Sequence, residues 1–275
     1  MATAAGAGTI CRNYVNGAWV ESKSHKIVER RNPANIDDLV TRVALSTRDE
    51  TKEAILAAET ALPGWRATPA PARGNILFKA ARLIEEQKTD LARLLTREEG
   101  KALKDALGEV QRSINIMEFM AGEARRLTGE TLPSELPKNF SYTVRQPVGV
   151  VGVITPWNFP LAIPVWKIAP ALVCGNTVVF KPATLTPLCA ARLVQIFEQA
   201  GLPAGVLNLV TGSGKEAGDE IATNEHVQAV SFTGSNAVGS DLYGTGANRM
   251  KKIQCEMGGK NPVVILKDAD LQLAM

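Results

Sequence analysis

Five short apolar runs follow one another through the second half of the chain, with helix-length segments between them. They cover residues 148–154, 177–180, 206–210, 229–232 and 252–256. Strands that are apolar along their whole length and alternate with helices are typical of a parallel sheet covered on both faces. The sequence therefore predicts an α/β fold in which ligands bind at the carboxyl ends of the strands.

The first half of the chain is expected to supply a hairpin and helices. Residues 14–20 predict two short strands around the turn Asn16-Gly17. Thr47 with Glu50 three residues later predicts a capping box, and the helix that it starts is expected to end at Pro63-Gly64. Apolar residues at helical spacing predict three more helices, over residues 76–84, 91–98 and 103–117.

Residues 128–147 interrupt the helical pattern with Gly129, Pro133 and Pro137. Phe140, Tyr142 and Val144 then alternate with polar residues, which predicts a strand with one polar face. Such a strand needs a partner.

Composition excludes several classes of protein. With 275 residues, of which 45% are apolar and 21% charged, the chain can bury a core. The net charge of +3 is small and the basic residues are scattered, so we expect neither a nucleic-acid nor a membrane partner. Residues 1–10 lack the pattern of a targeting signal, and no apolar run reaches the ~18 residues of a membrane span.

The cysteines and histidines point to a reducing compartment and to no metal. The four cysteines show no CxxC spacing, which favours free thiols and a cytoplasmic location. His25 and His226 are far apart, so a structural zinc site or a Ser-His-Asp triad would need convergence over a long range.

Each predicted parallel strand ends in residues that suit a dinucleotide, although no GxGxxG motif is present. Gly234 and Ser235 open a helix whose free N–H groups can hold a phosphate. A strand-to-helix turn of this kind often only connects two elements and binds nothing. Binding is favoured because all four strands are followed by turns that suit a dinucleotide. The four turns are Thr155-Pro156-Trp157-Asn158, Lys181-Pro182-Ala183-Thr184, Thr211-Gly212-Ser213-Gly214 and Thr233-Gly234-Ser235.

Three polar residues stand out as candidates for chemistry, each with a plainer alternative. Asn158 is either a turn former or an amide that donates to an oxygen gaining charge, a contact worth roughly 3 kcal/mol. Glu256, before Gly258-Gly259, is either a surface carboxylate or, if enclosed, a base with a raised pKa. Lys181 is either a lysine reaching to solvent at the sheet edge or a ligand for the cofactor. We expect Asn158 and Glu256 to face one common pocket.

Taken together and in this order along the chain, these motifs resemble the N-terminal part of the NAD(P)-dependent aldehyde dehydrogenases. The resemblance runs from Gly17 to the end and rests on PWNFPLAIPVWKIAPALVCGNTVVFKPAT, FTGS and EMGGKNP. It is strongest to α-ketoglutarate semialdehyde (2,5-dioxovalerate) dehydrogenases and next to succinate-semialdehyde dehydrogenases. It implies a Rossmann-like cofactor domain at residues 148–256 joined by the hairpin and helices of residues 1–127, a β oligomerisation arm at 128–147, and the start of a truncated catalytic domain at 257–275.

The resemblance also assigns roles to single residues. It implies that Asn158 forms the oxyanion hole, that Glu256 activates the water that releases the product, and that Lys167 lines the path from that base. It implies an aldehyde substrate and, for the full-length protein, a homodimer or homotetramer. The residues that it places around the cofactor are Ile154, Thr155, Pro156, Trp157, Lys181, Ala183, Thr184, Gly214, Gly218, Phe232, Thr233, Gly234, Ser235, Val238 and Met257.

One substitution bears on the choice of cofactor. Members selective for NAD usually carry Glu where this chain has Thr184, and that carboxylate repels a 2′-phosphate. Threonine is neutral and lies near Lys181 in sequence, so we predict use of NADP at least equal to that of NAD.

The family's nucleophilic cysteine falls beyond Met275. Cys255 does not replace it, because strand alternation points it away from the face of Glu256. We expect these 275 residues to be inactive alone, which leaves a nucleotide-binding module as the alternative. The acylating branch of the family, which uses coenzyme A, commonly lacks the glutamate base, so Glu256 favours hydrolysis.

Overall fold

The computed structural model describes residues 10–275; residues 1–9, most of the segment weighed for a targeting signal, lie outside the described residues. Its centre is a seven-stranded sheet in the order β12-β11-β8-β9-β10-β2-β3. The five strands expected from the apolar runs are parallel neighbours. They are β8 (Val150–Ile154), β9 (Thr177–Lys181), β10 (Leu207–Leu209), β11 (Ala229–Gly234) and β12 (Lys252–Met257).

The predicted hairpin is confirmed and extends this sheet. Strands β2 (Asn13–Val15) and β3 (Ala18–Val20) join through Asn16 and Gly17, both with positive φ, and β2 pairs antiparallel with β10. A separate three-stranded sheet is formed by β1 (Ile10–Cys11), β4 (Ile27–Asn32) and β5 (Asn35–Ala44).

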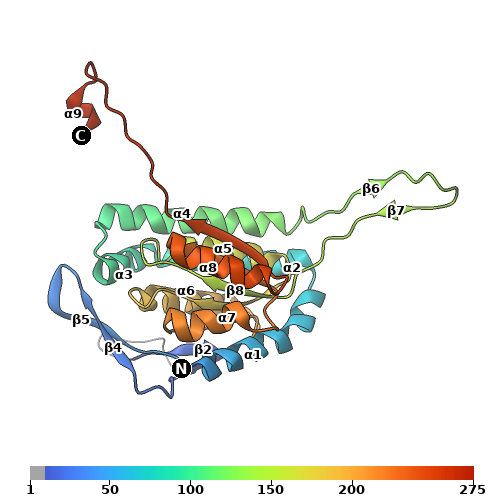
Figure 1. Cartoon of the computed structure of the whole chain (residues 1–275), viewed down its shortest axis with the longest axis horizontal. Coiled ribbons are helices and arrows are strands. Elements are labelled where there is room, and N and C mark those ends of the chain that lie inside the picture. The colour runs from blue at the N-terminus through green and yellow to red at the C-terminus, as the bar shows by residue number, and fades with distance from the viewer. Residues whose placement is uncertain (1–9) are drawn as a thin grey trace.

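Helices cover both faces of the central sheet, as alternation of side chains along each strand requires (Figure 1). Val151 and Val153 pack with Phe180 into a core shared with the helices α2 (Ala70–Glu86), α3 (Lys88–Glu99), α4 (Leu103–Glu123), α5 (Ala162–Val173) and α6 (Pro187–Ala200). Val150 and Val179 face the other core, with α1 (Arg48–Ala67), α7 (Asp219–Thr223) and α8 (Asn236–Ala247).

Helix α1 begins as predicted but ends later. The side chains of Thr47 and Glu50 cap each other's backbone N–H groups, which confirms the capping box. The end predicted at Pro63-Gly64 is wrong, because α1 continues through Pro63 to Ala67. The last turn carries Trp65, which is buried and donates from Nε1 to the carbonyl of Leu172 at 3.1 Å. Its tertiary contacts offset the hydrogen bond that proline cannot make.

The segment between α4 and β8 projects from the body as a thin hairpin (Figure 1). Its two strands, β6 (Thr131–Leu132) and β7 (Ser141–Tyr142), pair antiparallel. The strand predicted over Phe140, Tyr142 and Val144 is therefore shorter than its alternation indicated, and all three side chains are exposed.

After β12 the chain leaves the body and ends in the short helix α9 (Leu271–Ala274) (Figure 1). Within residues 10–275, no helix has the length and apolar character needed to cross a bilayer.

Candidate active site

A cavity of about 540 Å³, here called the upper cavity, opens at the carboxyl ends of the parallel strands. The register places Ile154 of β8 between Lys181 of β9 and Phe232 of β11. The turns that follow these three strands therefore start side by side at the same end of the sheet. Fourteen residues of the sequence-based site line it: Ile154, Thr155, Pro156, Trp157, Asn158, Lys181, Ala183, Gly214, Phe232, Thr233, Gly234, Ser235, Val238 and Met257.

Lys181 is enclosed, and the alternative of a lysine reaching to solvent is wrong. Its side chain is 7% exposed, and Nζ donates to the carbonyl of Pro182 at 3.1 Å. Burial lowers the pKa of Lys181 to about 8. An ammonium group buried beside a cavity without a carboxylate suits an anionic or hydroxyl-rich ligand.

The N-terminus of α8 forms another wall. Ser235 caps the helix by accepting from the N–H of Val238 at 3.4 Å. A Cβ at Gly234 would lie 2.4 Å from the ring of Phe232, so only glycine fits this turn without movement of the ring. The backbone at Gly234 therefore stays open to a ligand, next to the positive end of the helix.

The lining of the upper cavity fits a dinucleotide. Thr155 is 4% exposed, and its Oγ1 has no hydrogen-bond partner within the described residues. A buried hydroxyl of this kind calls for a partner, and a ribose or phosphate oxygen bound in the cavity would supply one. Together with Lys181 and the α8 N-terminus, it provides polar contacts among apolar walls.

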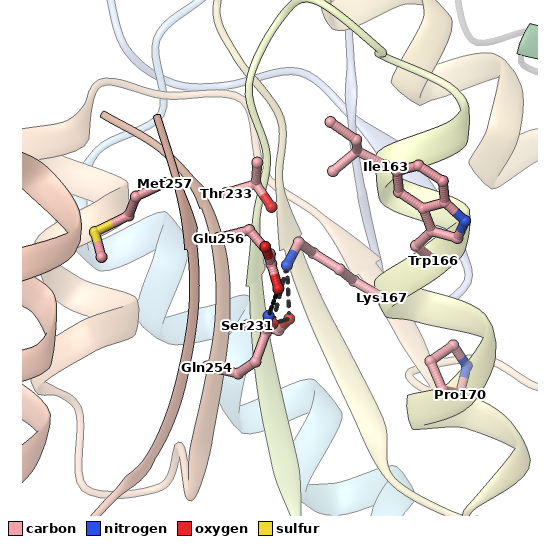
Figure 2. A pocket seen from close by; sticks show the side chains of 9 residues that line it. All are labelled: Ile163, Trp166, Lys167, Pro170, Ser231, Thr233, Gln254, Glu256 and Met257. Atoms are coloured by element: carbon pink, nitrogen blue, oxygen red, sulfur yellow. Dashed lines mark hydrogen bonds between the residues drawn. The ribbon is translucent and has the colours of Figure 1, made fainter. Parts of the chain in front are cut away.

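Glu256 lies in a second cavity, of about 680 Å³, here called the lower cavity (Figure 2). Its walls come from α5 on one side and from β11 and β12 on the other. They consist of Ile163, Trp166, Lys167, Pro170, Ser231, Thr233, Gln254, Glu256 and Met257.

Lys167 is the centre of the polar network in the lower cavity. Its Nζ donates to Ser231 Oγ at 2.9 Å and to Gln254 Oε1 at 3.1 Å (Figure 2). It also donates to the carbonyl of Phe232 at 3.2 Å. Burial lowers the pKa of Lys167 to about 8, while the charge of Glu256 acts in the opposite direction. Gln254 in turn donates from Nε2 to Glu256 at 2.9 Å. The lysine and the carboxylate thus share one network through Gln254.

The expectation that Asn158 and Glu256 face one common pocket needs correction. Asn158 lines the upper cavity and Glu256 the lower one. The two cavities adjoin, because Thr233 and Met257 line both, and Thr233 is the register partner of Glu256. The two side chains therefore flank a shared wall.

Glu256 is exposed within the described residues, and so is Asn158. The enclosure expected around Glu256 is thus not supplied by residues 10–275. Cys255 points the other way, as predicted from alternation: it packs with the core on the α8 side, and its Sγ donates to the carbonyl of Gly239 at 3.6 Å.

An ion pair between Lys101 and the buried Glu109 holds the loop that carries Asn158. Lys101 donates to the carbonyl of Asn158 at 2.8 Å and to Glu109 at 2.5 Å, and its Nζ lies 4.0 Å from the centre of the Phe159 ring. The other oxygen of Glu109 accepts from the N–H groups at the start of α5, those of Leu161 at 2.9 Å and Ala162 at 3.1 Å. The loop is therefore held at the backbone of Asn158 itself and again three residues later, where α5 starts.

Two predicted cofactor residues lie just outside the upper cavity. The hydroxyl of Thr184 donates to the carbonyl of Gly212 at 3.3 Å, which links the turns after β9 and β10. A Cβ at Gly218 would stand 3.6 Å from Cε of Lys181, an ordinary van der Waals contact, so this glycine lies beside the lysine stem.

Some site residues were missed from sequence. Ser231 and Gln254 each precede a predicted residue by two positions in a strand, so alternation could have found them. Lys101, Glu109 and Trp166 carry no comparable local signal.

Comparison with known proteins agrees with the motifs. Residues 19–275 match the model of the aldehyde dehydrogenase family. The chain is 48% identical over 262 residues to the alpha-ketoglutaric semialdehyde dehydrogenase of Bacillus subtilis (strain 168), covering 95% of this chain and 54% of the relative. The chain thus spans about half the length of the curated relative it matches.

Solved structures share the fold. A crystal structure of an NADP-dependent enzyme of E. coli superposes with a TM-score of 0.91 at 41% identity, covering 96% of this chain and 55% of the other. Betaine aldehyde dehydrogenase of Staphylococcus aureus, in complex with NAD+, gives a TM-score of 0.91 at 39% identity, covering 96% of this chain and 52% of the other. The chain belongs to the aldehyde dehydrogenase family.

Proposed function

We propose that these residues form the cofactor-binding part of an enzyme that oxidises a semialdehyde to a carboxylate with NADP or NAD. The observation that carries the proposal is the upper cavity at the strand ends. A buried lysine, a threonine hydroxyl without a hydrogen-bond partner in residues 10–275 and a helix N-terminus converge there. When bound there, the nicotinamide supplies the oxidising capacity of the reaction.

The chain's own residues then act on the substrate from the shared wall of the two cavities. The side-chain amide of Asn158 donates to the aldehyde oxygen as that oxygen gains charge. Glu256 takes a proton from the water that releases the acid, while Gln254 and Lys167 orient and support the carboxylate. The thiol that attacks the aldehyde comes, by the resemblance, from residues beyond Met275.

We propose α-ketoglutarate semialdehyde as the substrate. Support comes from the similarity to the Bacillus subtilis enzyme, whose name states that specificity. The alternative is succinate semialdehyde, the shorter compound with the same distal carboxylate.

The product of the complete reading frame that contains these residues tests the proposal. It is assayed with NADP or NAD and a panel of semialdehydes, by the absorbance of the reduced cofactor. We expect Asn158→Ala to lower kcat by about a hundredfold. We expect Glu256→Gln to give a burst of about one reduced cofactor per subunit and then slow turnover, since acid release needs the base.

Three outcomes would count against parts of this proposal. Absence of cofactor reduction with every semialdehyde would refute the activity. Dependence on coenzyme A would move the enzyme to the acylating branch. A lower KM and higher kcat for succinate semialdehyde would replace the proposed substrate.

The domain layout and assembly are further parts of the proposal. Residues 148–256 would form the cofactor domain, residues 257–275 the start of the catalytic domain, and residues 128–147 the arm. The arm exposes Leu132, Leu136, Phe140, Tyr142 and Val144, an apolar surface that pairing with another copy would cover. Light scattering should then show a dimer or tetramer of the whole protein, and deletion of residues 130–143 should yield monomers.

A further inference from the structure

A cavity of about 590 Å³, here called the arginine cavity, lies at the other end of the parallel strands from the candidate active site. Val148 and Asn176 in its wall precede β8 and β9, so it opens at the amino ends of the strands. Arg66 of α1, Arg73 of α2 and Arg145 at the base of the arm also line it.

The three arginines bond only to neutral groups in the part of the chain that the structure describes. Arg66 donates to the side-chain oxygen of Gln146 at 2.8 Å, and Arg145 donates to the carbonyl of Thr128 at 2.9 Å. Arg73 donates to the carbonyls of Val173 at 2.9 Å and Thr68 at 2.5 Å.

Not every arginine in residues 10–275 has a carboxylate partner: Arg192 and Arg249 also bond only to neutral groups, whereas others form ion pairs. Arg48 and Arg97, for example, each form an ion pair with a carboxylate, at 3.0 and 2.5 Å. Around the arginine cavity, the nearby Glu123 is already paired with Arg126. Three positive charges therefore line one hollow, and no carboxylate of residues 10–275 lines it with them.

Burial makes the charge of Arg73 costly, whereas Arg66 and Arg145 are exposed. Arg73 is 8% exposed, and burial lowers its pKa, although a guanidinium keeps its proton at any physiological pH. A buried cation without a counter-ion destabilises the fold, and an anion in the cavity would reverse that effect. Planar guanidinium groups match the paired oxygens of phosphate and carboxylate groups.

We propose that the arginine cavity binds a small doubly charged oxyanion, such as inorganic phosphate or a dicarboxylate. The anion would be held by Arg66, Arg73 and Arg145 together. Because these residues come from α1, α2 and the arm, the bound anion would tie the base of the arm to the body. The site would act independently of the cofactor, which is proposed to bind at the carboxyl ends of the strands.

The first experiment measures anion binding to the 275-residue chain by calorimetry. Phosphate and succinate are titrated at constant ionic strength, with chloride as the singly charged reference. We expect saturable binding of one anion, weakened about tenfold or more in the double variant Arg66→Gln/Arg145→Gln, which is ~1.4 kcal/mol. Both side chains are exposed, so the variant is expected to fold; Arg73 is left in place because it bonds to backbone.

The matched control is Arg82→Gln/Arg93→Gln, which removes the same charge from exposed positions on α2 and α3. This control should bind as tightly as the parent chain. Stronger binding of phosphate than of succinate would assign the site to phosphate compounds, and the reverse to dicarboxylates.

The second experiment locates the anion through Cys174, which also lines the arginine cavity. Burial raises the pKa of this thiol, while the charges of Arg73 and Arg145 lower it. A bound anion would cover the sulfur and offset those charges, so phosphate should slow alkylation of Cys174 by iodoacetamide severalfold. Cys255, equally half-buried in another part of the fold, is the internal control and should react at an unchanged rate.

Three results would overturn the proposal: no saturable binding, equal binding by the double variant, or alkylation of Cys174 at the same rate with and without phosphate. None of these results depends on aldehyde oxidation or on NADP, so failure here leaves the proposed function standing.

Discussion

The ammonium group of Lys101 lies 2.8 Å from the backbone carbonyl of Asn158, a residue 57 positions later in the chain. The same ammonium contacts Glu109, whose side chain is fully buried and also caps the first turn of α5. A helix, a loop and a second helix are thereby joined around the amide proposed to bind the substrate oxygen.

Replacing Glu109 should therefore destabilise the chain more than the loss of one surface charge. Glu109→Ala leaves two backbone N–H groups without an acceptor and takes one carboxylate partner from the half-buried ammonium of Lys101. We expect the free energy of unfolding in urea to fall by about 3 kcal/mol. Glu118→Ala, at an exposed position of the same helix, is the control and should change it by less than about 0.5 kcal/mol. Equal effects of the two variants would show that the buried network contributes little.

Much of the fold could be predicted from local patterns. Continuous apolar strands gave the parallel sheet, and the Asn16-Gly17 turn and the Thr47 box gave the hairpin and the start of α1. The end of α1 could not be predicted, because the contacts of Trp65 with a distant helix decide it.

The candidate site shows the same limit. Motifs at strand ends identified the lining of the upper cavity because parallel strands bring their ends together. The separation of Asn158 and Glu256 into two adjoining cavities depends on how α5 packs against β11 and β12, which no local pattern reports.

Glu98 should make stability depend on pH. It is buried in α3 and accepts from the backbone N–H groups of Leu188 at 2.7 Å and Cys189 at 2.8 Å, at the start of α6. Burial raises the pKa of Glu98 from 4.5 to about 7, so between these values the folded state binds more protons than the unfolded state. The contribution of this group is therefore fully present below pH 4.5 and is lost as the pH rises to about 7.

The measurement is the free energy of unfolding from pH 4.5 to 7 for the parent chain and for Glu98→Gln. The parent should lose up to ~1.4 kcal/mol per pH unit relative to the variant, since one proton is at stake. Glu85→Gln, exposed on α2, should keep the slope of the parent. Parallel curves for the parent and Glu98→Gln would contradict the raised pKa.

Lys181 should give cofactor binding a different pH dependence. Because burial lowers the pKa of Lys181 to about 8, its ammonium group is charged below pH 8 and neutral above it. We expect the affinity for NADPH, followed by fluorescence energy transfer from tryptophan, to fall as the pH rises through 8. Lys181→Met should bind about tenfold more weakly at pH 7 and lose this dependence. Lys252→Met, exposed on β12, should behave as the parent, and a similar loss in both variants would argue against a specific role.

Thr184 should decide between the two cofactors. It stands in the turn that begins with the buried Lys181 and donates to Gly212, so a neutral residue occupies the place where NAD-selective relatives are expected to carry glutamate. A carboxylate there would repel a 2′-phosphate but could bond a 2′-hydroxyl. We expect Thr184→Glu to change the ratio of Kd values for NADPH and NADH by about tenfold or more in favour of NADH, or ~1.4 kcal/mol. Thr184→Ser keeps the hydroxyl and should retain the preference of the parent. If Thr184→Glu leaves the ratio unchanged, or if the parent itself binds NADH more than about tenfold better, the choice of cofactor lies with residues that line the upper cavity and not with Thr184.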